Sequence, residues 1–154
     1  MDDIDRKILA ELQRDGRISI TDLADRVRLS LSPCHRRLRA LEKSGAISSY
    51  RAHLDATTLG LTFEALVFIS MRDTTQPTIA ALEKAVSEIP NVLMAHRLFG
   101  DPDYLLRVVA RDLSAFGTIY DQQLATLPGV QRLTSTLVMK NIVEDGPLPL
   151  SAIS

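Results

Sequence analysis

The feature that most constrains the fold of this chain is an internal repeat in its C-terminal part. Residues 64–73 and 103–112 match at an offset of 39, and both are rich in apolar and β-branched residues, as buried strands are. A helical pattern follows each segment, then a turn containing Pro90 or Pro128, then a second strand-like run. The repeat therefore predicts two β-α-β units in tandem, with helices over residues 77–88 and 114–126 and second strands over residues 92–98 and 130–138.

Two such units predict an α+β, ferredoxin-like domain, in which a four-stranded sheet carries two helices on one face. The strands have apolar residues on both alternations, as in Leu66 beside Val67 and Leu105 beside Leu106. The helices cover only one face, so the other face would leave apolar side chains in water. We therefore expect a second copy of the chain to cover it.

The first 54 residues follow a different pattern, which predicts three short helices. Apolar residues recur there at helical spacing, and small polar residues mark the points where helices begin. The predicted boundaries are Asp2 or Asp3 to Asp15-Gly16, Ser19 to a turn at Arg28-Leu29-Ser30, and Ser30 or Ser32 to Ser44 with Gly45 as the stop. Residues 47–54 then predict a short strand or wing.

The third predicted helix has two contrasting faces. Cys34, Leu38 and Leu41 form a buried stripe, whereas the rest of its surface is basic or able to hydrogen-bond. Such a helix, placed after a short helix and a tight turn, fits the major groove of double-stranded DNA. The candidate DNA-binding residues are Ser32, His35, Arg36, Arg37, Arg39 and Lys43, with Arg51 in the wing. The pattern alone also allows a small three-helix domain with a solvated basic helix.

The charge of the chain is distributed unevenly between its two parts. The net charge is −1, but residues 1–54 hold eleven Lys and Arg against eight Asp and Glu. Residues 55–154 hold seven against eleven, so the excess of acidic residues lies entirely in the second part. Attraction to phosphate depends on local charge, because salt screens charges beyond about 8 Å. The net charge therefore does not exclude DNA binding.

The N-terminal residues also resemble a known family. Ile4-Asp5-Arg6-Lys7-Ile8-Leu9, Leu23-Ala24, the run from Leu29 to Leu38, Leu41-Glu42 and Gly45-Ala46-Ile47 resemble the winged helix-turn-helix of the Lrp/AsnC transcriptional regulators. Arg28 stands where this family usually has glycine. The resemblance covers nearly the whole chain. It implies an amino-acid-responsive regulator whose C-terminal domain, called RAM, assembles homodimers and higher rings such as octamers.

The loop between the two repeats is the candidate effector site. It reads Gly100-Asp101-Pro102-Asp103-Tyr104, in which a glycine lets backbone amides approach a ligand and an aspartate can accept a hydrogen bond from an ammonium group. By its residues alone, a loop of this kind is more often a plain turn. The loop resembles the family's Gly-x-x-Asp-Tyr motif, which borders the effector pocket at subunit interfaces. The resemblance implies an amino-acid site at Gly100, Asp101, Asp103 and Tyr104, with Ser135 and Thr136 beside it.

Other chemistry has less support in the sequence. No apolar run reaches the roughly 20 residues of a membrane span and no basic signal region follows Met1, so we expect a cytoplasmic protein. Cys34 is the only cysteine, which rules out an intrachain disulfide. The histidines have no metal-ligand spacing, and no cofactor is expected besides an amino-acid effector. Asp101 and Asp103 could instead be a metal-binding pair.

Two rival functions remain open at the level of sequence. His96-Arg97 ahead of Gly100 keeps a sirohaem decarboxylase possible, because some proteins that resemble this family have that activity on the same two-domain build. An architectural DNA-binding protein without an effector would also fit. We expect a regulator and not an enzyme, with a DNA-binding domain over residues 1–54, a linker over 55–61, a sensing and oligomerisation domain over 62–143 and a tail over 144–154.

Overall fold

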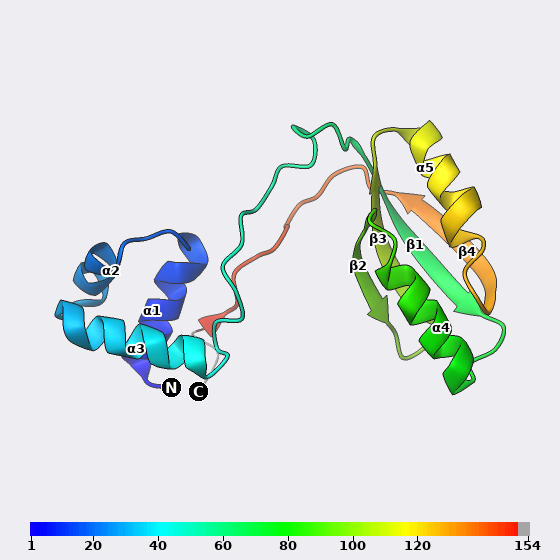
Figure 1. Cartoon of the computed structure of the whole chain (residues 1–154). Helices are drawn as coiled ribbons and strands as arrows, with labels where there is room; N and C mark the ends of the chain where they lie inside the picture. Colours follow the sequence, from blue (N-terminus) through cyan, green and yellow to red (C-terminus); the bar gives the residue numbers. More distant parts are fainter. Residues whose placement is uncertain (151–154) are drawn as a thin grey trace. The chain divides into compact units, whose positions relative to one another are not determined.

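The computed structural model describes residues 1–150 (Figure 1). The chain forms two compact units. One contains Met1–His53 together with the C-terminal segment that starts at Val143, and the other contains Leu54–Ile142. No helix in the described residues is long and apolar enough to cross a membrane.

The N-terminal unit has the three predicted helices, α1 (Asp3–Arg14), α2 (Ile20–Val27) and α3 (Leu31–Lys43). Their ends follow the capping residues found in the sequence. The Asp2 carboxylate accepts hydrogen bonds from the backbone N–H groups of Ile4 and Asp5, and the Ser19 hydroxyl accepts one from the N–H of Asp22. Each cap satisfies helix amides that have no partner within the helix. Ile8, Leu23 and Cys34 are fully buried where the three helices meet.

Arg28 makes the turn between α2 and α3 in the left-handed conformation, with φ 57° and ψ 48°. The next residue, Leu29, donates its N–H to the carbonyl of Ala24 at 2.9 Å, which closes the end of α2. A non-glycine residue in this conformation costs about 1 kcal/mol. The turn therefore requires the positive φ that glycine would adopt freely, and Arg28 places an exposed cation beside the start of α3.

The sequence predicts a short strand or wing over residues 47–54, and of these two alternatives the strand is wrong. The described chain has no strand there, because no other segment pairs with these residues to satisfy their backbone groups. Side chains hold the segment instead. Ile47 packs against the helical core, and the Tyr50 hydroxyl donates to Glu42 Oε1 at 3.2 Å.

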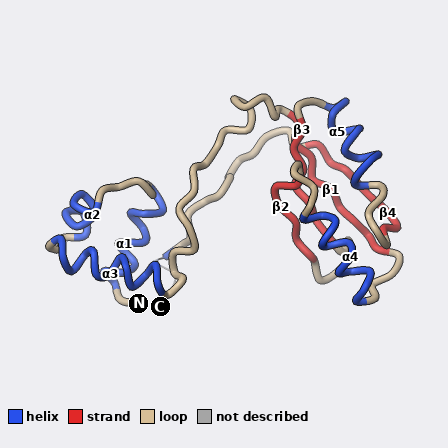
Figure 2. The backbone as a smooth tube through the Cα atoms, viewed as in Figure 1, coloured by secondary structure: helices blue, strands red, loops and turns tan. Residues whose placement is uncertain are grey.

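The second unit has the predicted α+β architecture. Its elements are β1 (Phe63–Met71), α4 (Gln76–Ser87), β2 (Val92–Arg97), β3 (Tyr104–Ala110), α5 (Leu113–Ile119) with a π-helical turn at Tyr120–Leu124, and β4 (Val130–Leu137). The strands form an antiparallel sheet in the order β2-β3-β1-β4, and α4 and α5 lie on the same face (Figure 2). Alternate residues of β1 and β3 fill the core beneath the helices, led by Val67, Ile69, Leu106 and Val108.

The other face of the sheet stays uncovered within the described chain. Its central strands carry Leu66, Phe68 and Leu105, which are only partly buried. Among them Arg107 donates two hydrogen bonds to the Glu64 carboxylate, at 2.8 and 3.0 Å. Arg107 holds the pKa of Glu64 below its usual range. We call this surface the open sheet face.

The segment after β4 belongs to the N-terminal unit. The N–H of Leu148 donates to Gln13 Oε1 at 2.7 Å, and Gln13 Nε2 donates back to the Leu148 carbonyl at 3.4 Å. Leu150 packs against the core of α1, α2 and α3. These contacts fasten the segment to α1 and to the helical core, and we call it the clasp.

We expect the clasp to stabilise the helical unit. Replacing both Gln13 and Leu150 with alanine removes two hydrogen bonds and one partly buried leucine, which should lower the free energy of unfolding of this unit by about 2 kcal/mol. Hydrogen exchange of the α1 amides would measure the loss locally. Leu148→Ala is the matched control, because the Leu148 side chain is exposed and its backbone bonds survive. Equal exchange in both variants would contradict the prediction.

Candidate DNA interface and effector site

The outward face of α3 is the first candidate site. Ser32, His35, Arg36, Arg39 and Lys43 are all exposed, as is Arg51 in the segment that follows. Across residues 1–150, neither Arg36 nor Arg39 makes an ion pair or side-chain hydrogen bond. Cys34 and Leu41, on the opposite face, are buried and fix the rotation of the helix. The two guanidinium groups of Arg36 and Arg39 therefore face solvent, on a helix whose opposite face is packed into the core.

Arg37 is placed differently from its two neighbours. Its Nη1 lies 2.7 Å from Asp2 Oδ2 and 2.8 Å from Asp5 Oδ1, so it joins α3 to the beginning of α1. Hydrogen bonds to Asp5 and Asp2 raise the pKa of Arg37. The pKa of Asp2 is lowered, chiefly by the Asp5 amide and also by Arg37. From the sequence, Arg37 is among the candidate DNA-binding residues. In the structure, its guanidinium group forms ion pairs with Asp2 and Asp5 of the same unit.

The loop between β2 and β3 is the second candidate site, and backbone bonds fix it to β1. The N–H of Asp103 donates to the Ile69 carbonyl at 2.9 Å, and the N–H of Leu98 donates to the Asp103 carbonyl at 2.7 Å. The Asp103 carboxylate accepts the Met71 N–H at 2.7 Å. Gly100 has φ 145°, a conformation that favours glycine. Asp103 therefore fixes the shape of the loop by bonding to the backbone of β1.

A polar cavity of about 600 Å³ opens beside this loop. Gly100, Asp101 and Asp103 line it together with four residues that the sequence prediction missed: Ser70, Met71, Gln131 and Arg132. The Ser70 hydroxyl donates to Asp101 Oδ1 at 3.0 Å, and Arg132 Nη2 lies 3.9 Å from the same oxygen. Asp101 and Arg132 are largely exposed, at 77% and 66%. The cavity therefore offers an acceptor and a cation side by side.

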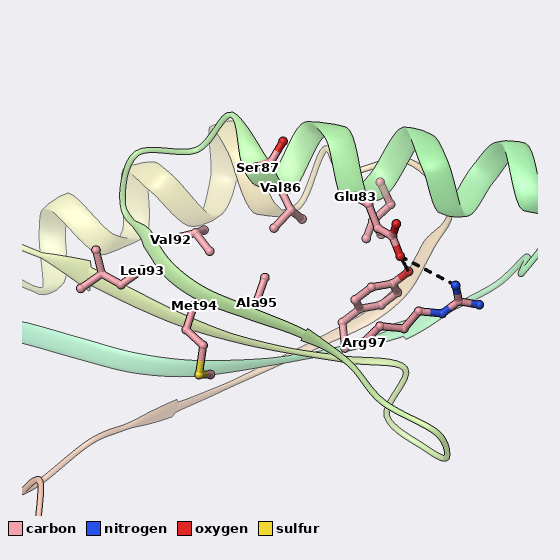
Figure 3. Close-up of a pocket in the computed structure, with 10 residues that line it drawn as sticks. Glu83, Val86, Ser87, Val92, Leu93, Met94, Ala95 and Arg97 are labelled. Carbon is pink, nitrogen blue, oxygen red and sulfur yellow. Dashed lines mark hydrogen bonds and ion pairs between the residues drawn. The ribbon is translucent and has the colours of Figure 1, made fainter. Parts of the chain in front are cut away.

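Three of the predicted effector residues do not line this polar cavity. Tyr104 is buried, donates its hydroxyl to Glu83 Oε1 at 2.9 Å, and lines a separate cavity between α4 and β2, which is drawn in Figure 3. Ser135 and Thr136 pair with Val67 and Leu66, whereas the loop meets β1 at Ser70 and Met71. One subunit thus does not bring Ser135 or Thr136 to the Gly100 loop.

No group of three or more histidine, cysteine, aspartate or glutamate side chains comes together anywhere in residues 1–150. His96 and Arg97, which kept a tetrapyrrole enzyme open, are adjacent on β2 and so lie on opposite faces of the sheet. Tyr104 pairs with Arg97 and Leu105 with His96, in keeping with that alternation.

Both parts of the chain match families of known proteins. Residues 1–48 match the family model of a winged helix-turn-helix DNA-binding domain, and residues 64–148 match that of the Lrp/AsnC ligand-binding domain. Among curated proteins, the Bkd operon transcriptional regulator of Pseudomonas aeruginosa is 37% identical over 97% of this chain and 98% of its own length. The proline dehydrogenase transcriptional activator of Rhodobacter capsulatus is 38% identical over 94% of each.

Solved structures agree with these relatives over the whole length. A transcriptional regulator from Neisseria meningitidis, in complex with L-Met, has a TM-score of 0.93 and 36% identity over 97% of both chains. An AsnC family regulator from Agrobacterium tumefaciens has a TM-score of 0.94 and 34% identity over 100% of both. These relatives are transcriptional regulators and not enzymes.

Proposed function

The chain belongs to the Lrp/AsnC family of transcriptional regulators, and from that premise we propose how its residues divide the work. The protein acts in the cytoplasm as a homo-oligomer that binds double-stranded DNA through α3 and a free amino acid at the Gly100 loop. The observation that carries the proposal is that Arg36 and Arg39 are exposed on α3, whereas Arg37, which lies between them in the sequence, is bonded to Asp2 and Asp5.

DNA recognition is assigned to α3 lying in the major groove. Arg36 and Arg39 can each make two hydrogen bonds to a guanine, and Ser32 and His35 can reach neighbouring base edges or phosphates. Lys43 and Arg51 supply phosphate contacts that add affinity without sequence preference. Arg37 is proposed to orient α3 through its bonds to Asp2 and Asp5.

Amino-acid binding is assigned to the polar cavity beside the Gly100 loop. A free amino acid carries an ammonium and a carboxylate on one carbon, so it needs an acceptor and a donor close together. Asp101 can accept from the ammonium and Arg132 can bind the carboxylate, and their charged atoms lie 3.9 Å apart. Ser135 and Thr136 could join this cavity only from a neighbouring subunit, because their own strand carries them away from it.

Arg132→Gln and Asp101→Asn are each expected to abolish the amino-acid response while leaving ligand-free DNA binding unchanged. A hydrogen bond to a charged group is worth roughly 1.5–3 kcal/mol, so each variant should bind the effector about 10-fold to 100-fold more weakly. Calorimetry with each of the amino acids measures binding, and mobility shift of a promoter fragment measures the response. Arg111→Gln is the matched control, since it removes an exposed arginine from the same unit.

The same experiment tests the ligand-sensing half of the function. If an effector changes affinity for DNA, DNA must change affinity for the effector by the same factor. A screen in which no amino acid binds, with or without DNA, would contradict the effector proposal. It would leave a DNA-binding protein without an effector, of the architectural kind.

A further inference from the structure

A second cavity, away from the open sheet face, lies between α4 and the edge strand β2. Its volume is about 310 Å³, at the lower end of the range of small-molecule pockets. Leu82, Val86 and Val92 form an apolar wall, and Ala95 faces it from the strand. Figure 3 shows Val86 pointing from the helix toward the strand and Ala95 pointing back from the strand. The space would hold about ten water molecules, and hence a ligand of about that many heavy atoms.

One end of this cavity is charged. Glu83 from α4 and Arg97 from β2 both line it, and Figure 3 shows them together at one end. Arg97 Nη1 lies 3.8 Å from Glu83 Oε1, which is too long for a hydrogen bond. Both side chains are about half exposed, so the pair is solvated and opens at little cost.

Tyr104 holds Glu83 in position from beneath. Its hydroxyl donates to Glu83 Oε1 at 2.9 Å, and the tyrosine is only 3% exposed. Burial and the neighbouring carboxylate raise the pKa of Tyr104 to about 12, so it stays a hydrogen-bond donor. The second oxygen of Glu83 remains available to accept from a ligand.

We propose that this cavity is a second ligand site, which binds a free α-amino acid with an aliphatic or thioether side chain. The ligand's ammonium group donates to Glu83, and the ligand's carboxylate accepts from Arg97. The zwitterion thus lies between two side chains that form only a long ion pair with each other. The side chain occupies the apolar space between Val86 and Ala95. A polar side chain would lose its hydration there without gaining a partner.

Two residues of this cavity also contact the space beside the Gly100 loop, so a ligand bound here can affect that loop. Arg97 and Tyr104 also line a small cavity of about 170 Å³ together with Gly100 and Asp103. A ligand that draws Arg97 toward its carboxylate therefore acts on a side chain that borders the loop. The site is distinct from the loop cavity, which is lined by Asp101 and Arg132.

Calorimetry of the full chain with L-leucine and L-methionine tests the proposal. Arg132→Gln serves as the background, so that the result does not depend on the Gly100-loop site. We expect one binding event per chain, and Glu83→Gln should weaken it 10-fold to 100-fold while keeping the bond from Tyr104. Glu88→Gln, at the residue that follows the same helix and outside the cavity, is the matched control and should bind normally.

Ligand analogues and a blocking variant complete the test. The compound 4-methylpentanoate lacks the ammonium and 3-methylbutylamine lacks the carboxylate, so each should bind at least 10-fold more weakly than L-leucine. Ala95→Phe should fill the cavity and abolish binding, whereas Ala81→Phe, an exposed position on α4 outside it, should not. Binding that survives Ala95→Phe, or no binding in the Arg132→Gln background, overturns the proposal. So does a change of oligomeric state on Ala95→Phe, which would make the groove a subunit contact.

Discussion

Replacing Arg36 and Arg39 together with alanine is expected to lower the affinity for a specific promoter site by about 2–6 kcal/mol. Each guanidinium that makes two hydrogen bonds to a guanine contributes roughly 1–3 kcal/mol of discrimination, and neither arginine has a partner among the described residues that could draw it away. The loss corresponds to a fall of about 30-fold to about 20,000-fold in affinity. Binding to unrelated DNA should fall much less, because the phosphate contacts of Lys43 and Arg51 remain.

Titrations of promoter and unrelated DNA at one salt concentration measure this difference. The fold should survive, since solvent-facing substitutions usually change stability by within about 0.5 kcal/mol, and thermal unfolding would verify it. Lys7→Ala with Arg17→Ala is the matched control, because it removes two exposed charges from the same unit outside α3. If the double variant of α3 binds the promoter as the unchanged protein does, α3 is not the reading helix.

The open sheet face is expected to hold the oligomer together, and making it polar should dissociate the subunits. Phe68 and Leu105 are register partners on β1 and β3, so Phe68→Glu with Leu105→Lys places opposite charges across from each other. Such a cross-strand pair is compatible with the fold of the sheet. In the interface it would bury two ions, at a cost of several kcal/mol each, which corresponds to a loss of 1,000-fold or more in self-association.

Light scattering of the full chain at micromolar concentration measures the assembly. The unchanged protein should be a dimer or a larger ring, and the double variant a monomer with unaltered helix and sheet content. Leu113→Lys is the control, because this leucine is exposed on α5 and away from the open sheet face. A monomeric unchanged protein, or a variant that still assembles, would show that subunits do not meet through this face.

The elements that the sequence predicts well are those set by local chemistry. Asp2 and Ser19 cap helices because a side-chain oxygen reaches an amide two or three residues away, which sequence alone reveals. The tandem repeat gives the strands and helices of the second unit, because each half buries its apolar residues in the same pattern. The candidate residues on α3 follow from the period of the helix once its buried stripe is known.

Contacts between elements that are distant in the sequence could not be predicted from the sequence. Arg37 looks like its neighbours in the sequence, and only the approach of α1 shows that Asp2 and Asp5 hold it. Ser70 and Arg132 reach the Gly100 loop because β1 pairs with β4 in one particular register. A shift of two residues would have offered different side chains to the same loop. Tyr104 points to α4 because the alternation along β3 puts it on the helix face.

The discontinuous make-up of the N-terminal unit has a consequence for how the protein is made. Its helices are encoded by residues 1–53, but its clasp comes from the segment that starts at Val143, after the whole of residues 54–142. During synthesis, α1 therefore leaves the ribosome before Leu148 and Leu150, its partners in the clasp, have been made. Until then, the helices lack the stabilisation that we expect the clasp to provide. The N-terminal, DNA-binding unit can therefore form all of its contacts only after the ligand-binding unit has been synthesised.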